Sequence, residues 1–152
     1  MTRVGEGPFP SEIVGPDHER VQTLGHEFGT VTGRERRCGW LDLVALRFAV
    51  RVNGVTSLAL TKLDVLSAFH ELPVCVRYQL PDGSETDEFP AHQSDFHHCR
   101  PVFEVLAGWE VPIDDALPDA ARAYVRFVEE ALGVPVTLVG TGAAREHVLA
   151  LR

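Results

Sequence analysis

Hydrophobic positions recur at helical spacing near the end of the chain. Across residues 120–132 apolar side chains return every three or four positions, after Pro118 and Asp119 and before Gly133. This pattern predicts an amphipathic helix with a proline at its start and a glycine at its end. Its apolar stripe consists of Tyr124, Phe127, Val128, Ala131 and Leu132. We expect the stripe to pack in the core.

A second helical pattern runs from Gly39 to Asn53. Its apolar positions fall near one face, and Gly54 follows where a left-handed residue commonly ends a helix. The face consists of Leu41, Val44, Ala45, Phe48 and Val52. The pattern therefore predicts a helix that opens near Gly39.

Shorter apolar runs predict strands. Residues 55–64 form an apolar stretch that is typical of a strand buried on both faces. Residues 71–80 and 84–89 flank the turn sequence Pro-Asp-Gly at 81–83, which predicts a β-hairpin. Residues 134–140 are predicted to form a further strand.

The remaining segments have weaker patterns. Residues 1–16 are rich in proline and glycine, which predicts an irregular entry segment. Residues 91–109 are predicted to be a loop with a short strand, and residues 143–152 a last helix. Because strands alternate with helices, we expect a single domain over residues 1–152 with an α/β fold: part of a mostly parallel sheet with flanking helices plus a β-hairpin.

Length and composition limit the class of protein. The 152 residues suffice for one compact core. No apolar run approaches the roughly 20 residues that span a bilayer, and the start, MTRVGEGPFPSE, lacks an export segment, so we expect a soluble cytoplasmic protein. The net charge of -8 argues against a nucleic-acid partner, which would need a broad basic face. Cys38, Cys75 and Cys99 are an odd number without a close pair, which favours reduced structural thiols.

Positive charge is clustered in one short stretch of this acidic chain. The stretch precedes the second predicted helix and contains Thr30, Thr32, Gly33, Arg34, Arg36 and Arg37. Hydroxyls, backbone amides and guanidinium groups are the groups that bind carboxylates and phosphates. The alternative is a solvated loop whose arginines pair with surface acids such as Glu35. His26 and Glu27, beside the stretch, are expected to support it rather than to act as catalysts.

A second candidate site lies where the strand predicted over residues 55–64 ends. Ligands of open α/β sheets bind beyond the carboxyl ends of strands, and Thr61, Lys62 and Asp64 occupy that place. The Asp64 carboxylate can accept hydrogen bonds from the ring N–H and the exocyclic amine of guanine, while the lysine stem lies along the base. Adenine lacks this pair of donors, so a buried carboxylate would select guanine. The alternative is that Lys62 and Asp64 only cap the strand end in water.

Two further motifs are weaker. The first is the turn formed by Gly140, Thr141 and Gly142. It would let the backbone approach a ligand and present amides at the start of the last predicted helix; the alternative is an ordinary turn. The second is the run of His97, His98 and Cys99. Adjacent side chains on an extended segment point to opposite faces, so we expect no metal site there.

Six segments together resemble the C-terminal part of the adenylosuccinate synthetase family, in order and across the whole chain. They are VGEGPFPSE, GHEFGTVTGRERRCGWLD, NGVTSLALTKLDVL, PVFEVLAGW, ARAYVRFVEEALGVPV and VGTGAARE. The resemblance implies a ligase of purine nucleotide biosynthesis that joins IMP to L-aspartate, using GTP and Mg²⁺. The reaction would pass through 6-phosphoryl-IMP and form adenylosuccinate, GDP and phosphate.

The resemblance also implies roles for the candidate residues. The loop that closes over aspartate and IMP would consist of Thr30, Val31, Thr32, Gly33, Arg34, Glu35 and Arg36. Arg34 would also contact IMP, and Arg36 would also contact GTP. The guanine pocket would consist of Lys62, Leu63, Asp64, Gly140, Thr141 and Gly142. The chain departs from the family's pattern at Val31, Glu35, Gly140 and Ala143, where a hydroxyl, a proline or basic residue, a serine and a proline are usual.

One requirement of this reaction has no counterpart in the sequence. Phosphoryl transfer needs a glycine loop with a lysine, a magnesium ligand and a base, and the only lysine, Lys62, follows Thr61 instead. The family's N-terminal catalytic aspartate and histidine are not matched either. We therefore assign no catalytic residue and no Mg²⁺ ligand here, and expect no ligase activity from the chain alone.

Two interpretations of the chain follow. In the first, it acts with an N-terminal partner segment and forms a homodimer, because strands that belong to a larger sheet leave open edges. In the second, it is a non-catalytic GTP- or GDP-binding module or a remnant of the enzyme.

Overall fold

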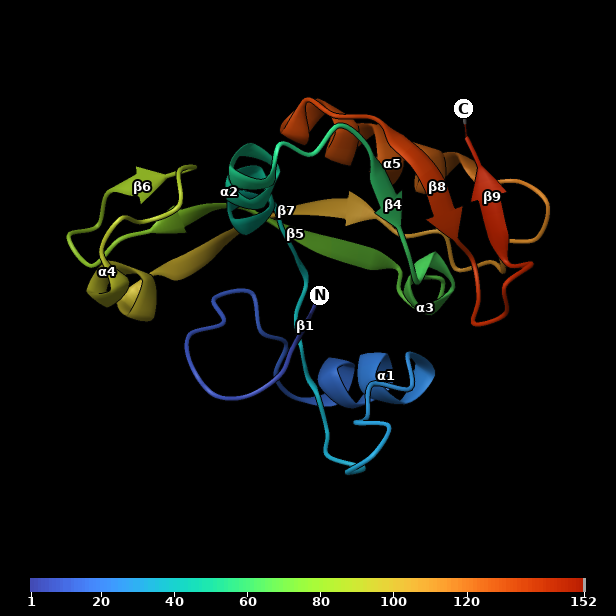
Figure 1. Ribbon diagram of the computed structural model, residues 1–152, viewed down its shortest axis with the longest axis horizontal. Coiled ribbons are helices and arrows are strands. Elements are labelled where there is room, and N and C mark those ends of the chain that lie inside the picture. Colours follow the sequence, from blue (N-terminus) through green and yellow to red (C-terminus); the bar gives the residue numbers. More distant parts are fainter. Residues whose placement is uncertain (152) are drawn as a thin grey trace. The chain divides into compact units, whose positions relative to one another are not determined.

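The computed structural model describes residues 1–151 (Figure 1). Contacts within the chain define two compact units, each formed by two segments that are distant in the sequence. The first unit consists of Met1–Phe48 and Pro73–Glu104, and the second of Ala49–Leu72 and the described residues from Val105 onward. The expectation of a single domain over residues 1–152 stays a prediction.

In the first unit, a short pair of strands connects the N-terminus to the segment at the end of the arginine cluster. β1, Thr2–Arg3, pairs antiparallel with β2, Arg37–Cys38. Between them in sequence lies α1, Pro16–Leu24, with its proline in the first turn. Sequence analysis missed this helix because its sequence is polar and only Gln22 is buried, so it has no apolar stripe. The predicted irregular segment before it is confirmed, apart from β1 and one isolated bridge at Glu12.

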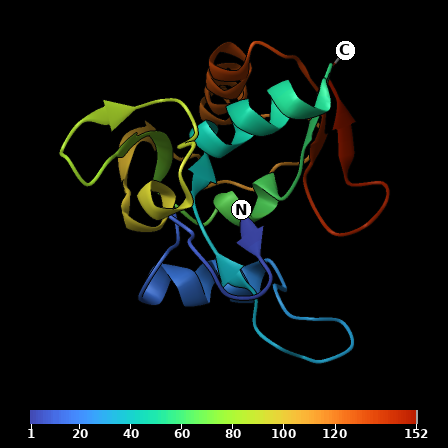
Figure 2. The same cartoon turned by 60° about the vertical axis from the view of Figure 1, so that its left-hand side comes forward.

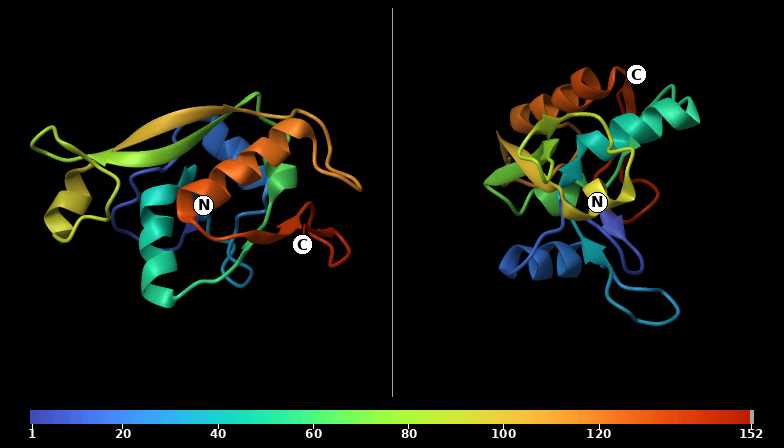
Figure 3. Two further views of the ribbon diagram at one scale, coloured as in Figure 1. Left: turned by 90° about the horizontal axis from the view of Figure 1, so that it is seen from above. Right: turned by 90° about the vertical axis from the view of Figure 1, so that its left-hand side faces the viewer.

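A four-stranded sheet is built around β5, Glu71–Gln79. β3, Leu41–Asp42, runs parallel to β5, and β6, Glu85–Thr86, pairs with β5 antiparallel. β7, Arg100–Ala107, also pairs with β5 (Figure 3). The β-hairpin predicted around the Pro-Asp-Gly turn is confirmed, and Gly83 there has a φ of 87°.

The segment predicted as a loop with a short strand contains more regular structure. α4, Gln93–His98, and the long strand β7 occupy most of residues 91–109, so this prediction is wrong. β7 lacks the expected alternation because Phe103, Glu104 and Val105 are exposed in succession. A strand that is partly exposed on both faces gives no period-two signal.

α2, Leu43–Asn53, starts later than the predicted opening near Gly39, because β2 and β3 occupy the preceding residues. Asp42 lies directly before the helix, and its Oδ1 accepts a hydrogen bond from the backbone N–H of Ala45 at 3.0 Å. This contact caps the first turn. Gly54, with a φ of 59°, follows the helix in the left-handed conformation that was predicted.

The buried face of α2 differs from the predicted one. Leu43 and Val44 are fully buried, whereas Phe48 and Val52 are 39% and 58% exposed. Phe48 instead stacks on Phe89 with 4.9 Å between ring centroids. The helix therefore buries its first turn rather than a stripe along its whole length.

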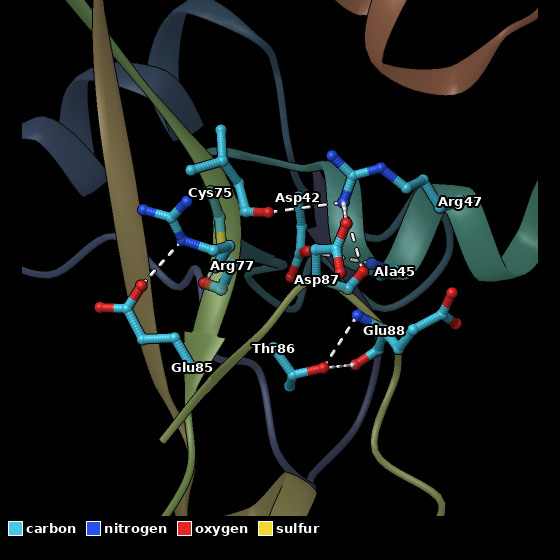
Figure 4. A network of polar contacts seen from close by, with 10 residues as sticks. Asp42, Ala45, Arg47, Cys75, Arg77, Glu85, Thr86, Asp87 and Glu88 are labelled. Atoms are coloured by element: carbon cyan, nitrogen blue, oxygen red, sulfur yellow. Dashed lines mark hydrogen bonds and ion pairs between the residues drawn. The ribbon is translucent and has the colours of Figure 1, made fainter. Parts of the chain in front are cut away.

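A buried carboxylate lies in the core of the first unit. Asp42 is 2% exposed, and the hydroxyl of Tyr78 donates to its Oδ2 at 2.6 Å. Figure 4 shows Asp42 beside the first turn of α2, with Arg47 and Asp87 nearby. Burial raises the pKa of Asp42 and raises the pKa of the Cys75 thiol to about 12. All three cysteines of the chain are free thiols, as predicted.

The second unit contains a three-stranded sheet and a long helix (Figure 1). β4, Leu58–Leu60, runs parallel to β8, Val136–Gly140, and β9, Val148–Ala150, pairs antiparallel with β8. α5, Asp119–Leu132, precedes β8 and ends at Gly133, which has a φ of 67°. Both ends of this helix agree with the prediction.

The buried face of α5 largely matches the predicted stripe. It consists of Ala121, Tyr124, Val125, Val128 and Leu132. The predicted Phe127 and Ala131 are half-buried. Trp109 packs edge-on against Tyr124 with 5.8 Å between ring centroids, so this helix has a well-defined aromatic contact.

Two predictions for the second unit are wrong. β4 exists, but Ala59 is exposed and the strand lies at one edge of its sheet, so it is not buried on both faces. The last predicted helix is replaced by β9, because pairing of Leu138 with Ala150 outweighs the local helical preference. The loop between β8 and β9 can be followed in Figure 3. Arg152, the end of the predicted helix, lies outside the described residues.

The α/β fold class is confirmed: helices flank mixed sheets, and a β-hairpin is present. Within residues 1–151, no helix combines the length and the apolar character needed to cross a bilayer.

Candidate functional site

The arginine loop, residues 30–36, projects from the first unit between α1 and β2 (Figure 2). Its base is closed by two backbone hydrogen bonds of 2.7 Å, from Gly29 N to Arg34 O and from Gly33 N to Gly29 O. Gly33 has a φ of 65°, which glycine adopts without strain. Val31, at the tip, is 97% exposed. The loop is therefore held at its base while its tip lies in solvent.

The three arginines of the cluster have different partners. Arg37 Nε donates to Glu12 Oε1 at 2.6 Å, and Arg36 Nη1 donates to Glu27 Oε2 at 3.1 Å. The guanidinium of Arg34 is exposed and has no partner among residues 1–151. The alternative of a solvated loop whose arginines pair with surface acids is therefore met only in part. Arg37 pairs with the partly exposed Glu12, whereas the partner of Arg36 is buried, and neither ion pair uses Glu35.

Arg37 belongs to the scaffold rather than to a binding surface. Besides Glu12 it binds the carbonyl oxygen of Gly7 at 2.8 Å, and its guanidinium lies 5.6 Å from the ring centroid of Phe9. Hydrogen bonding to Arg37 lowers the pKa of Glu12. These contacts connect β2 to the segment after β1.

Of the two residues expected to support the loop, Glu27 does so in the structure. Glu27 is 4% exposed, its carboxylate binds Arg36, and its carbonyl oxygen accepts the Arg36 backbone N–H at 3.0 Å. His26 has a φ of 49° and an exposed side chain without a partner among the described residues.

The candidate guanine site lies in the second unit, where β4 and β8 end. Because these strands are parallel and Leu60 is paired with Val139, the chain leaves both strands at the same edge of the sheet. A Cβ on Gly140 would lie 3.2 Å from the Cα of Thr61, so the two segments approach closely. The structure thus brings the two predicted halves of the pocket together.

The turn after β4 combines an uncommon backbone conformation with an acid that has one buried oxygen. Lys62 has a φ of 64°, a left-handed conformation that side chains other than glycine adopt infrequently. α3, Leu63–Leu66, begins directly after it, and Leu63 is fully buried. Asp64 Oδ1 is buried and has no hydrogen-bond partner among residues 1–151. Such an oxygen costs free energy unless a ligand or water donates to it. The buried oxygen does not fit the alternative that Lys62 and Asp64 only cap the strand end in water, whereas the exposed side chain of Lys62 does fit it.

The turn after β8 differs from its predicted form. Thr141 N donates to His147 O at 2.9 Å, and the chain continues into β9. No helix begins here, so the prediction of amides at a helix start is wrong. A Cβ on Gly142 would meet the ring of His147, so a side chain there would require the exposed His147 side chain to move. Sequence analysis missed His147 because it approaches the turn only when β9 folds back on β8.

The histidine run has a different geometry from the one expected. His97 and His98 lie in α4 rather than on an extended segment, and Nδ1 of His98 lies 2.8 Å from the carbonyl oxygen of Ser94. Among residues 1–151, no group of three His, Cys, Asp or Glu side chains is arranged to hold a metal ion.

Comparisons with known proteins agree over the whole chain. A family model described as adenylosuccinate synthetase matches residues 1–149. Adenylosuccinate synthetases from Sorangium cellulosum and Acidothermus cellulolyticus are 54% and 49% identical to it over 99% of this chain and 36% of their own length. A fully ligated adenylosuccinate synthetase from Plasmodium falciparum superposes with a TM-score of 0.94 at 34% identity, over 100% of this chain and 38% of that one. The chain therefore spans about a third of the length of these relatives.

Proposed function

Because the chain belongs to the adenylosuccinate synthetase family, we propose that it contributes an aspartate-binding loop and a guanine pocket to a ligase of purine biosynthesis. The reaction joins IMP to L-aspartate with GTP and forms adenylosuccinate, GDP and phosphate. Since the chain spans 36% of the length of its relatives, we propose this reaction for a complete assembly.

The guanine pocket is supported above all by the buried, unpaired Oδ1 of Asp64. Guanine carries two adjacent N–H donors, one on the ring and one on the exocyclic amine. A carboxylate at the end of β4 can accept both, and the neighbouring stem of Lys62 can lie along the base. Gly140, where Thr61 approaches closely, and the Thr141–Gly142 turn after it would form the other wall.

The arginine loop is supported by its exposed charge. L-Aspartate has two carboxylates, and the guanidinium groups of Arg34 and Arg36 can each bind one, with about 1.5 to 3 kcal/mol for each charged hydrogen bond. Arg34 would also contact IMP, and Arg36 would also contact GTP. The hydroxyls of Thr30 and Thr32 can donate to the same ligand. Val31 cannot, so this loop would make one hydrogen bond fewer than a loop with a hydroxyl there.

The remaining chemistry would come from another polypeptide segment. In the proposed reaction O6 of IMP attacks the γ-phosphorus of GTP and GDP leaves; the amino group of aspartate then attacks C6 and phosphate leaves. Mg²⁺ would neutralise phosphate charge in the complete enzyme. We assign no Mg²⁺ ligand to the residues of this chain. We assign no catalytic residue to it.

Two measurements test this proposal. Mixing the chain with the N-terminal portion of a family member should produce adenylosuccinate from IMP, L-aspartate and GTP, whereas neither portion alone should do so. Calorimetry of the chain with GDP and with ADP should give binding heat for GDP only. GDP binding without turnover in any mixture would favour a non-catalytic binding module, and no heat for GDP at millimolar concentration would contradict the pocket.

The proposal includes a cytoplasmic location and a homodimer. A dimer is supported by β4, which lies at the edge of its sheet in the described chain, because open edges favour pairing with another chain. Sedimentation of the chain across a range of concentrations tests this part, and a monomer at all concentrations would contradict it.

A further inference from the structure

The ion pair between Arg36 and Glu27 joins a half-exposed cation to a buried anion. The side chain of Arg36 is 35% exposed, whereas that of Glu27 is 5% exposed, and the two are 3.1 Å apart. Taking a carboxylate out of water is costly without a charged partner, so Arg36 and Glu27 are energetically coupled. This contact distinguishes Arg36 from the exposed, unpaired Arg34.

The backbone of Glu27 is hydrogen-bonded both to the last turn of α1 and to the end of the arginine loop. Its backbone N–H donates to the carbonyl oxygen of Gln22, in the last turn of α1, at 2.9 Å. Its carbonyl oxygen accepts the backbone N–H of Arg36 at 3.0 Å. The carboxylate therefore stands at a fixed point beside the end of the loop.

The contact leaves most of the guanidinium available. Arginine has five N–H donors, and Arg36 uses Nη1 toward Glu27 while no other side-chain contact of its guanidinium is found among residues 1–151. One edge of the group is oriented by Glu27, and the other donors can bind a ligand anion. Arg36 is thus oriented without being blocked.

We propose that Glu27 is a positioning residue that holds the Arg36 guanidinium in the orientation in which it binds an anionic oxygen of the substrate. This inference rests on the proposed function of the arginine loop and adds a residue to it. An arginine side chain that rotates freely must be ordered when the ligand binds, and this ordering opposes binding. Glu27 orders Arg36 in advance, so its effect should fall on the affinity for the ligand.

The first experiment uses the 152-residue chain without ligand. Side-chain nitrogen relaxation measured by NMR should show Arg36 Nε ordered and Arg34 Nε mobile in the wild type. Glu27→Gln keeps the size of the side chain but removes its charge, and it should make Arg36 as mobile as Arg34. Glu19→Gln is the matched control, because Glu19 is an exposed acid of α1 and the change in net charge is the same. Equal order of Arg36 in the wild type and in Glu27→Gln would overturn the inference.

The second experiment uses the mixture with an N-terminal portion and measures KM for L-aspartate separately from kcat. We expect Glu27→Gln to raise KM about tenfold, Glu27→Asp to restore part of the loss, and Glu19→Gln to leave KM within about twofold. A lower kcat with an unchanged KM would mean that Glu27 only stabilises the fold, and would overturn the inference. An inactive wild-type mixture would contradict the proposed function instead, and the relaxation experiment would still decide whether Glu27 orders Arg36.

Discussion

The arginine loop and the strand-end pocket are built in opposite ways. The loop is exposed, with Val31 at 97% and an Arg34 that has no side-chain partner in the described chain. The pocket follows two paired parallel strands, with Leu63 and Val139 fully buried. The loop therefore exposes charged side chains to solvent, whereas the pocket contains one unpaired oxygen, Asp64 Oδ1, beside buried side chains.

This difference separates two kinds of recognition. Exposed guanidinium groups attract any small anion, and salt weakens that attraction. A buried carboxylate discriminates between bases, because a base without matching donors leaves it unpaired. We therefore expect substitutions in the loop to change affinity and substitutions in the pocket to change stability or selectivity.

Stability should show the largest contrast. Leu63→Ala removes a fully buried side chain beside the pocket and should lower the free energy of unfolding by about 2 to 5 kcal/mol. Val31→Ala, at the exposed tip of the loop, should change it by no more than about 0.5 kcal/mol. Urea unfolding of the chain measures both. Similar losses for the two variants would mean that the loop is packed as firmly as the pocket.

Base selectivity should change next. In Asp64→Asn the amide can donate to O2 of xanthine and accept from its ring N–H, so preference should move from GDP to XDP by about 10- to 100-fold. Calorimetry with both nucleotides measures the ratio of the two dissociation constants. An unchanged preference for GDP would place base recognition elsewhere in the chain.

Aspartate use should depend on Arg34 with little effect on nucleotide binding. Arg34→Ala should lower kcat/KM for L-aspartate about tenfold or more in the mixture, because a charged hydrogen bond is lost. Arg34→Lys, which keeps the charge but not the planar fork, should lie between this variant and the wild type. GDP binding should stay within about twofold. Equal losses for aspartate and GDP would indicate a structural role for the loop.

The smallest expected effect is that of replacing Arg37, which supports the loop, on the free energy of unfolding. This effect should depend on pH. Arg37 lowers the pKa of Glu12 below its ordinary value of 4.5, so the stabilisation is present above that value and is lost as pH falls through the lowered pKa. Arg37→Gln should therefore cost about 1 kcal/mol of unfolding free energy near pH 7, and this cost should decrease as pH falls below 4.5. A loss that is equal at both pH values would assign the effect of Arg37 to packing.

Both candidate sites were predicted from the sequence, and they stay predictions, whereas their internal contacts could not be predicted. The arginine cluster and the Lys62–Asp64 turn are marked by residue type and by their place beside predicted elements. Arg37 and Glu12 are 25 positions apart in the sequence, so no local pattern predicts their ion pair. The contact of His147 with Gly142 likewise requires β9 to be in place.

The helices and strands show the same division between local signals, which could be predicted, and long-range contacts, which could not. α5 was predicted with both ends because its stripe, opening proline and closing glycine are local signals. α1 was missed because a helix that buries only Gln22 has no stripe, and β9 was mistaken for a helix because its partner β8 lies outside any local window.

The sequence by itself therefore determined α5, the hairpin, the α/β class and the family resemblance, since each depends on patterns within short segments. Only the tertiary structure decided which arginine is free, which is held by Glu27 and which is part of the scaffold. It also decided that Asp64 keeps a buried oxygen without a donor. The physical reason is that burial and ion pairing depend on neighbours brought together by folding, and the energy of a charged group is set by those neighbours.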